Sequence, residues 1–478
     1  MTSSIVKFVY NNKIVEIQSP DPNETILNYI RIKLKKTGTK EGCAEGGCGA
    51  CTIVLGELKG NKINYKAINS CIAFVPALEG KQLILVEDLV LKGDLHPVQK
   101  AMVKYHGSQC GFCTPGFVMS LFSMYKNYSK LSDNLIKDSI SGNLCRCTGY
   151  KPIIKAAKSL RSKNKIDHFT KNKKKTIAQL KEIGKASIAI YRKDKRYFAP
   201  RYVSELKKIL KKNINSQLLS GGTDLSLVVT KDKKDIDSII YMNSIKELNY
   251  IKNNNQYIEI GATTPLSELE LYIKKYYPDF NKILRRYGSV QIRNVATVAG
   301  NIATASPIGD TLPLLLALNS TVVLQGIKKS KILPINDFFI SYRKTKLKVG
   351  QFIHSIRIPI FNKRVFKAYK ISKRFDDDIS SVCAAFNLAI ENKKIKDIKI
   401  AYGGMAAIPK RATYCEKALL NSSITKETID KAKSALEKDF KPISDMRASG
   451  KYRRIIAKNL LEKCFLEIKE KKLIGIHN

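Results

Sequence analysis

The sequence predicts a multidomain α+β chain in which two small cysteine-containing domains precede a larger α+β region. Three observations support this prediction. The chain has 478 residues, which is enough for three or four domains of ordinary size. Eight of its eleven cysteines fall into two sets between residues 43 and 147. After residue 163 a polar, lysine-rich stretch intervenes before a new apolar pattern begins.

The first cysteine set lies in the motif EGCAEGGCGACT and comprises Cys43, Cys48 and Cys51, with Cys71 further along. This spacing is typical of a plant-type 2Fe–2S ferredoxin loop. The glycines between the cysteines free the backbone to wrap around a cluster and to aim amide groups at its sulfurs. We therefore predict a 2Fe–2S cluster held by these four thiolates.

The residues around the first set predict a small mixed sheet crossed by one helix. The stretch KFVYNNKIVEI alternates apolar and polar residues about Asn11–Asn12, which predicts a β-hairpin. TILNYIRIKLKKTG has apolar residues at helical spacing and predicts a helix that ends at Gly38. Together with later extended segments, this predicts a β-grasp ferredoxin domain over residues 1–85.

The second cysteine set consists of Cys110 and Cys113 in QCGFC, and Cys145 and Cys147 in LCRC. Paired thiolates make tetrahedral zinc sites as well as iron–sulfur sites, so these residues alone leave zinc and iron open. Thiolates beside helix N-termini are favoured by the unpaired amides and the helix dipole there.

Three prolines predict that this second set sits among helices. We expect His96-Pro97 to begin one helix, Thr114-Pro115 to cap another directly after Cys113, and Pro152 to begin a third. The prediction is an all-helical cluster domain over residues 88–163. The histidines, His96 and His106 among them, are expected to pack or cap.

A disulfide framework is disfavoured, because the start MTSSIVKFVYNNK has no apolar signal-peptide core. The longest apolar run, LPLLLAL, is too short to cross a membrane. These features predict a cytoplasmic chain without membrane association. The remaining cysteines, Cys383, Cys415 and Cys464, are isolated and are expected to be packing residues.

The region after the lysine-rich stretch has no GxGxxG fingerprint, which argues against a Rossmann domain. It has two other glycine-containing turns, LLSGGTDLSLVV and VATVAGNIATASPIGDTLPLLLAL. Such a turn can cradle a phosphate with free amides, or can simply connect a strand to a helix. Either turn alone leaves both interpretations open.

The motifs EGCAEGGCGACT, SQCGFCTPGF and GNLCRCTGYKPI resemble the two iron–sulfur domains of the xanthine dehydrogenase family of molybdenum hydroxylases. The resemblance implies that Cys110, Cys113, Cys145 and Cys147 also hold a 2Fe–2S cluster. It further implies that Gln109 reaches the pterin of a molybdopterin cofactor.

The two glycine-containing turns, in this order, resemble the flavin domain of the same family. This implies a basic linker over 164–195, a non-Rossmann α+β FAD-binding domain over 196–362 and a small α+β C-terminal domain over 366–475. The run Asp376–Asp378 either belongs to this site or is solvated. The FAD-binding residues that the resemblance implies are Leu219, Ser220, Gly221, Gly222, Thr223, Asp224, Leu225, Tyr287, Thr297, Val298, Ala299, Gly300, Asn301, Asp310, Ile353 and Lys370.

The net charge of +44 raises the question of nucleic-acid binding. The lysines are spread over every predicted domain, and aromatic residues do not interleave with them as a stacking platform requires. We therefore expect no specific nucleic-acid partner and favour an acidic partner subunit.

The resemblance extends over residues 1–470, whereas eukaryotic members continue into a molybdenum domain and this chain ends at Asn478. It implies an iron–sulfur/FAD small subunit of the bacterial type, with a separate molybdopterin-binding large subunit, in a heterotetramer of two small and two large subunits. Electrons from purine oxidation would pass through both clusters to FAD and then to NAD, with no catalytic residue in this chain. A partner acting on an aldehyde or N-heterocycle, a stand-alone electron carrier, and oxygen as acceptor remain open.

Overall fold

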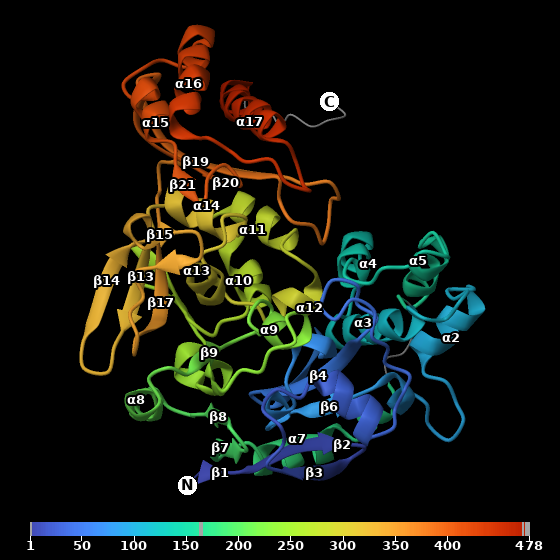
Figure 1. The fold of residues 1–478 in the computed structure, drawn as a ribbon. Helices are drawn as coiled ribbons and strands as arrows, with labels where there is room; N and C mark the ends of the chain where they lie inside the picture. The colour runs from blue at the N-terminus through green and yellow to red at the C-terminus, as the bar shows by residue number, and fades with distance from the viewer. Residues whose placement is uncertain (1, 162–165, 471–472, 474–478) are drawn as a thin grey trace. The chain divides into compact units, whose positions relative to one another are not determined.

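A computed structural model describes residues 2–161, 166–470 and 473 of the chain, which contains both helices and strands (Figure 1). The chain divides into two compact units. The first comprises Met1–Lys246 and Gly288–Ala296, and the second comprises Glu247–Tyr287 and Thr297–Asn478. The predicted ranges 88–163, 164–195 and 366–475 each include a few terminal residues outside the described part.

The first sheet of the first unit contains the predicted hairpin. Strand β2 pairs with β3 along its length, and Asn11 and Asn12 between them both have positive φ, 48° and 59°. A two-residue hairpin turn needs such angles at both positions, and asparagine tolerates them. The strand order is β3-β2-β6-β4-β5. The bounds are β2 (Ile5–Tyr10), β3 (Lys13–Gln18), β4 (Thr52–Lys59), β5 (Lys62–Asn69) and β6 (Gln82–Ile84).

The helix beside this sheet is shorter than the sequence predicts. The α-helix α1 (Ile26–Asn28) continues as the π-helix η1 (Tyr29–Lys33) and ends at Leu34. Lys35 then adopts a left-handed φ of 54°, which stops the helix before Gly38. The predicted end at Gly38 was therefore wrong. Short 3-10 turns follow later as η2 (Ser70–Ile72), η3 (Val75–Leu78) and η4 (Val86–Leu89).

The four cysteines of the second set lie in the segments that connect four helices, α2 to α5, which are seen in Figure 1. Pro97 and Pro152 lie in the first turns of α2 and α5, as predicted. Thr114 is the first residue of α3 rather than its cap, because Cys113 occupies the N-cap position. The bounds are α2 (Pro97–Lys104), α3 (Thr114–Asn127), α4 (Asp133–Ile140) and α5 (Lys151–Lys158).

A buried charged triad ties these helices to the following segment. His96 Nδ1 accepts a hydrogen bond from the Val98 amide at 3.2 Å, which confirms its predicted capping role and leaves the proton on Nε2. His96 Nε2 then donates to Asp167 at 3.0 Å, and Lys126 donates to the other oxygen of Asp167 at 2.7 Å. Asp167 caps α6 (His168–Lys171), which precedes α7 (Lys173–Glu182).

The second sheet of the first unit has the order β1-β7-β8-β10-β9, with β10 parallel to both β8 and β9. Its strands are β1 (Thr2–Ser3), β7 (Ser187–Arg192), β8 (Lys195–Ala199), β9 (Gln217–Leu219) and β10 (Ser238–Tyr241). The helical segments in this part are α8 (Val203–Lys212), α9 (Leu227–Thr230), η5 (Met242–Ser244) and α12 (Val290–Arg293).

The second unit contains an antiparallel sheet of order β11-β12-β17-β13-β14 and several helices. Its strands are β11 (Ile251–Asn253), β12 (Tyr257–Gly261), β13 (Thr321–Gln325), β14 (Ser330–Pro334) and β17 (Phe352–Pro359). Its helices are α10 (Leu266–Ile273), α11 (Pro278–Arg285), α13 (Val298–Thr304) and α14 (Thr311–Ala317). A small pair, β15 (Phe339–Ser341) and β16 (Lys344–Thr345), follows η7 (Ile335–Asp337).

The C-terminal part of the second unit is a four-stranded sheet with three helices, drawn in orange and red in Figure 1. Cys383, Cys415 and Cys464 are buried in this unit, which confirms their predicted packing role. The bounds are β18 (Val365–Ile371), β19 (Val382–Glu391), β20 (Lys394–Gly403), β21 (Lys410–Arg411), α15 (Thr413–Leu419), α16 (Lys426–Asp439) and α17 (Gly450–Glu470).

None of the helices that the structure describes combines the length and the apolar character that crossing a bilayer requires.

The buried triad predicts an acid-sensitive contribution to stability. We expect Asp167→Asn to lower the free energy of unfolding by roughly 3–5 kcal/mol at neutral pH, since Lys126 stays buried without its charged partner. The pKa of Asp167 is below its ordinary value: burial opposes this, but hydrogen bonds from His96 and Lys126 outweigh burial. The stabilisation is therefore present above the unfolded-state pKa of about 3.9 and is lost as pH falls below it.

Urea unfolding followed by circular dichroism, at neutral pH and near pH 3, measures this contribution. The difference in the free energy of unfolding between wild type and Asp167→Asn should be smaller near pH 3 than at neutral pH. Asp133→Asn is the control, because Asp133 pairs with Lys158 and Arg161 on the exposed surface of the same helical region. Equal effects of the two substitutions would contradict the prediction.

Candidate functional site

The four cysteines of the first set converge, although Cys71 is distant in sequence. Cys51 directly precedes β4, and Cys71 lies in η2 directly after β5, which pairs with β4. The Cys51 and Cys71 sulfurs are 3.3 Å apart, and both side chains are buried. Hydrogen bonding with the thiols of Cys48 and Cys71 lowers the pKa of Cys43.

The backbone of this loop supports thiolates, as the glycine-rich motif predicts. The amides of Glu45 and Gly47 donate to Cys43 Sγ at 3.4 and 3.3 Å. A Cβ atom at Gly42 would lie 2.7 Å from Cys48 Sγ, so only glycine leaves that sulfur in place. The loop is thus shaped around the thiols it carries.

The second set also forms sulfur pairs. Cys110 and Cys147 sulfurs are 3.6 Å apart, and Cys113 hydrogen-bonds with Cys145. Burial, followed by that hydrogen bond, raises the pKa of Cys113 to about 12. The pKa of Cys145 is lowered despite burial, because the Thr148 hydroxyl at 3.2 Å and amide at 3.5 Å hydrogen-bond its sulfur.

The sulfurs of each set lie in pairs, and this arrangement is compatible with a 2Fe–2S cluster, which takes two thiolates on each iron. Within the described ranges, no group of three or more His, Cys, Asp or Glu side chains is arranged to hold a single metal ion.

The first set packs against a later segment of the same unit. Leu227 and Ile292 contact the small apolar core that includes Cys51 and Cys71. A Cβ atom at Gly222 would lie 3.0 Å from the carbonyl oxygen of Ile72, the residue after Cys71. The first predicted FAD loop therefore adjoins the first cysteine set.

The predicted FAD loop Leu219–Leu225 connects β9 to α9. Leu219 is the buried last residue of β9, and the rest of the loop is half-buried. A Cβ atom at Gly221 would lie 2.2 Å from the Val295 carbonyl oxygen, so the backbones touch here. Ser220 donates to Asn243 Oδ1 at 2.5 Å, which fixes the loop from the other side.

The second predicted loop, in the second unit, is the beginning of a helix rather than an open turn. Thr297 is the N-cap of α13, and its hydroxyl accepts a hydrogen bond from the Gly300 amide at 3.0 Å. Val298, Ala299, Gly300 and Asn301 form the first turn. Threonine is a favoured N-cap residue, and the sequence signal for a helix start was present in Thr297.

Asp310 and Lys370 form a buried ion pair in the second unit, with 2.7 Å between Lys370 Nζ and Asp310 Oδ2. Lys370 Nζ also donates to the Arg286 carbonyl at 2.8 Å, and the Ser380 hydroxyl donates to Asp310 Oδ1. The structure thus brings together two residues that were expected to serve one site. Arg286 and Ser380 were missed, because only the fold places them here.

The other predicted residues are Tyr287, Ile353, Gln109 and the acidic run Asp376–Asp378. Tyr287 is half-buried just after α11, and Ile353 is buried on β17 opposite Leu324. Gln109 is exposed beside Cys110. In the acidic run, Asp378 accepts a hydrogen bond from the Arg374 amide at 2.8 Å and holds its own loop.

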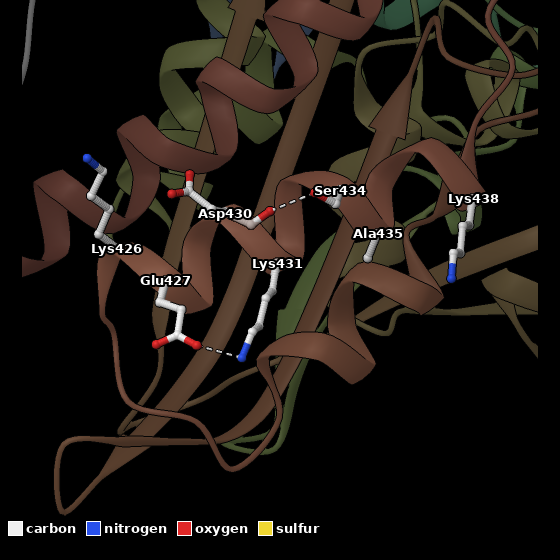
Figure 2. Close-up of a pocket in the computed structure, with 7 residues that line it drawn as sticks. All are labelled: Lys426, Glu427, Asp430, Lys431, Ser434, Ala435 and Lys438. Atoms are coloured by element: carbon white, nitrogen blue, oxygen red, sulfur yellow. Dashed lines mark hydrogen bonds and ion pairs between the residues drawn. The ribbon is translucent and has the colours of Figure 1, made fainter.

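A surface hollow on α16 is formed by residues of that helix alone (Figure 2). Glu427 and Lys431 form an ion pair across one turn at 2.7 Å, and the Ser434 hydroxyl donates to the Asp430 carbonyl. None of the predicted cofactor residues lines it. Its lining residues are Lys426, Glu427, Asp430, Lys431, Ser434, Ala435 and Lys438.

Four family models match the chain in sequence order. They are a 2Fe-2S iron–sulfur cluster binding domain over residues 8–76, a [2Fe-2S] binding domain over 85–158, an FAD binding domain in molybdopterin dehydrogenase over 191–361, and a CO dehydrogenase flavoprotein C-terminal domain over 367–468. These define an iron–sulfur flavoprotein. Together they place the chain in the molybdenum hydroxylase family.

Curated relatives are named xanthine dehydrogenase. One from Emericella nidulans is 33% identical over 91% of this chain and 36% of its own length. One from Dictyostelium discoideum is 30% identical over 98% of this chain and 41% of its own length. The chain thus spans about two fifths of the length of these relatives.

Solved structures resemble a little more than half of the chain. Carbon monoxide dehydrogenase from Hydrogenophaga pseudoflava, which lacks the Mo-pyranopterin moiety of the molybdenum cofactor, matches with a TM-score of 0.53 and 26% identity, over 56% of this chain and 94% of that chain. Quinoline 2-oxidoreductase from Pseudomonas putida 86 has the same TM-score at 20% identity, over 57% of this chain and 95% of that chain, a likeness of fold alone.

The close packing at Gly42 predicts a selective loss of one cluster. In Gly42→Ala the new methyl group would displace Cys48 Sγ, so we expect a protein with about half the iron and the spectral signature of one 2Fe–2S cluster. Gly47→Ala is the matched control in the same loop, because a Cβ atom there meets nothing closer than 4.0 Å. Iron analysis gives the iron content of the two variants, and electron paramagnetic resonance of the reduced proteins shows which clusters they contain. Full iron in Gly42→Ala would contradict the prediction.

Proposed function

We propose that this chain is the electron-transfer part of a xanthine dehydrogenase, taking electrons from hypoxanthine or xanthine oxidised at a molybdopterin-binding partner. The observation that carries the proposal is the pairing of eight thiols in two sets, with the first set packed against Leu227 and Ile292 beside the first predicted FAD loop. When bound, the two clusters would supply single-electron transfer, and FAD would supply storage of two electrons for delivery to NAD.

The chain's own residues would bind and orient these groups. Cys43, Cys48, Cys51 and Cys71 would hold one cluster, and the remaining four thiolates the other. Leu219–Leu225, Thr297–Asn301, Tyr287, Ile353 and the Asp310–Lys370 pair would hold FAD. Gln109, exposed beside Cys110, would face the pterin of the partner. No residue here is assigned as a general base or nucleophile.

The arrangement we propose has five parts: a β-grasp ferredoxin domain (1–85), a helical cluster domain (88–163), a basic linker (164–195), a non-Rossmann FAD domain (196–362) and a small C-terminal domain (366–475). The partner would be a separate large subunit, in an assembly of two small and two large subunits. The thiolates require a reducing compartment, for which we propose the cytoplasm.

The purine substrate is favoured by relatives named xanthine dehydrogenase, which match more than nine tenths of this chain. Two structural neighbours are named for other substrates, carbon monoxide and quinoline. The second candidate is therefore the same electron-transfer role beside an aldehyde- or N-heterocycle-oxidising partner.

Co-expression with a molybdopterin-binding large subunit tests the proposal. We expect xanthine-dependent NAD reduction by the complex, and NADH oxidation with an artificial acceptor by this chain alone. Full iron and FAD without xanthine turnover would favour the second candidate. Zinc in place of iron would overturn the electron-transfer role.

The buried pair predicts a specific effect on FAD. We expect Lys370→Ala to weaken FAD binding about tenfold or more, because one charge-assisted hydrogen bond contributes about 1.5–3 kcal/mol. Lys367→Ala is the control on the same strand, since Lys367 pairs with Glu467 instead. FAD titration followed by fluorescence measures the affinity of both variants, and thermal unfolding followed by circular dichroism confirms that each variant is folded. Equal affinities would contradict the assignment of Lys370.

A further inference from the structure

A buried polar network in the first unit joins three chain segments that are far apart in sequence. Gln291 Nε2 lies 3.2 Å from Thr52 Oγ1, 3.1 Å from Ser120 Oγ and 3.1 Å from Asn143 Oδ1. Ser120 also donates to Asn143 Oδ1 at 2.6 Å. The four side chains are 0–2% exposed, so water does not compete for these bonds.

The network ends on the loops that carry the two cysteine sets. Asn143 Nδ2 donates to the Gly49 carbonyl at 3.0 Å, and the Thr52 hydroxyl donates to the same carbonyl at 2.6 Å. The next residue, Leu144, donates its amide to the Cys48 carbonyl at 3.0 Å. Cys48 and Cys145 are therefore connected through covalent bonds and a single hydrogen bond.

Close packing leaves no room for a side chain at Gly142 and Gly116. A Cβ atom at Gly142 would lie 2.2 Å from the Ser289 side chain, and one at Gly116 would lie 2.2 Å from the Gly49 carbonyl oxygen. Gly49 itself has a φ of 70°, which suits glycine. The loops approach each other as closely as backbones can.

The network is not optimised for stability alone. Of the residues that the structure describes, none donates a hydrogen bond to the buried Gln291 Oε1. A buried acceptor without a partner costs about 1–3 kcal/mol, and an apolar side chain would avoid that cost. What Gln291 does instead is hold Asn143 against the loop of Cys48.

We propose that Asn143 is a positioning residue for electron transfer between the two clusters, with Gln291 and Ser120 fixing its amide. By holding the Gly49 carbonyl, Asn143 sets the Leu144–Cys48 hydrogen bond and hence the separation of Cys48 from Cys145. This rests on the proposed function. In the step that Asn143 would serve, one electron would pass from a cluster held by Cys145 to a cluster held by Cys48, with no bond made or broken and no proton moved.

The test compares Asn143→Ala with wild type in the whole chain, loaded with iron and FAD. Dithionite reduces both clusters, and low-temperature electron paramagnetic resonance records the magnetic interaction between them. A redox titration gives the two cluster potentials, which depend on hydrogen bonding and exposure. We expect a weaker interaction and a shift in both potentials. Electron exchange between the clusters should be slower in Asn143→Ala than in wild type, because the rate falls as the separation grows.

Asn127→Ala is the matched control. Asn127 also links α3 to the first sheet, exchanging hydrogen bonds with the Tyr65 backbone at 2.6 and 3.1 Å, but it lies away from the cysteine loops. Ser120→Ala is a milder variant that keeps Asn143 and should change the interaction in the same direction by less.

Unchanged interaction and potentials in both Asn143→Ala and Ser120→Ala would overturn the positioning role. The same changes in Asn127→Ala would also overturn it, because any loosening of the two parts would then suffice. Wild-type protein that lacks the iron of two clusters would instead overturn the proposed function. The iron content of wild type thus separates the two failures.

Discussion

The close approach of thiols in pairs is the constraint on which the first unit depends. In three of the four pairs one cysteine has a lowered pKa and its neighbour a raised one: Cys43 with Cys48, Cys51 with Cys71, and Cys145 with Cys113. Two thiolates at such distances repel, so without a cation one thiol of the pair keeps its proton. Iron binding would release that proton, because the ligands are thiolates. The glycine-rich loop, the amides aimed at Cys43 and the close packing at Gly42 all serve this pairing.

The two cysteine sets differ in how exposed their side chains are. Cys51 and Cys71 are buried against apolar side chains, whereas Cys110 and Cys147 are exposed. An electron carrier inside the protein is insulated from solvent, and one near the surface is accessible to another molecule. In the proposed function the exposed set receives electrons from the partner, and the buried set passes them on within the chain. The polar network around Asn143 lies between these two environments.

Features of the fold that depend on a few neighbouring residues could be predicted from the sequence. The Asn11–Asn12 turn, the prolines that begin α2 and α5, and the cysteine spacing each follow from a few neighbouring residues. The early end of η1 and the capping of α3 by Cys113 were missed, since the geometry of the neighbouring loops decides them. Gln291 could not be found at all. It is an ordinary polar residue until the fold carries it to Asn143, more than a hundred residues away in sequence.

In the second unit, the buried Asp310–Lys370 ion pair needs an explanation other than stability. Removing two charges from water costs several kcal/mol for each ion, and the attraction between them repays this only when further hydrogen bonds satisfy both groups. Ser380 and the Arg286 carbonyl supply those bonds here. Apolar residues of similar volume would nevertheless give comparable stability. A fixed carboxylate and ammonium are therefore better explained by a polar ligand that they orient, and they lie at two positions where the family resemblance expects FAD.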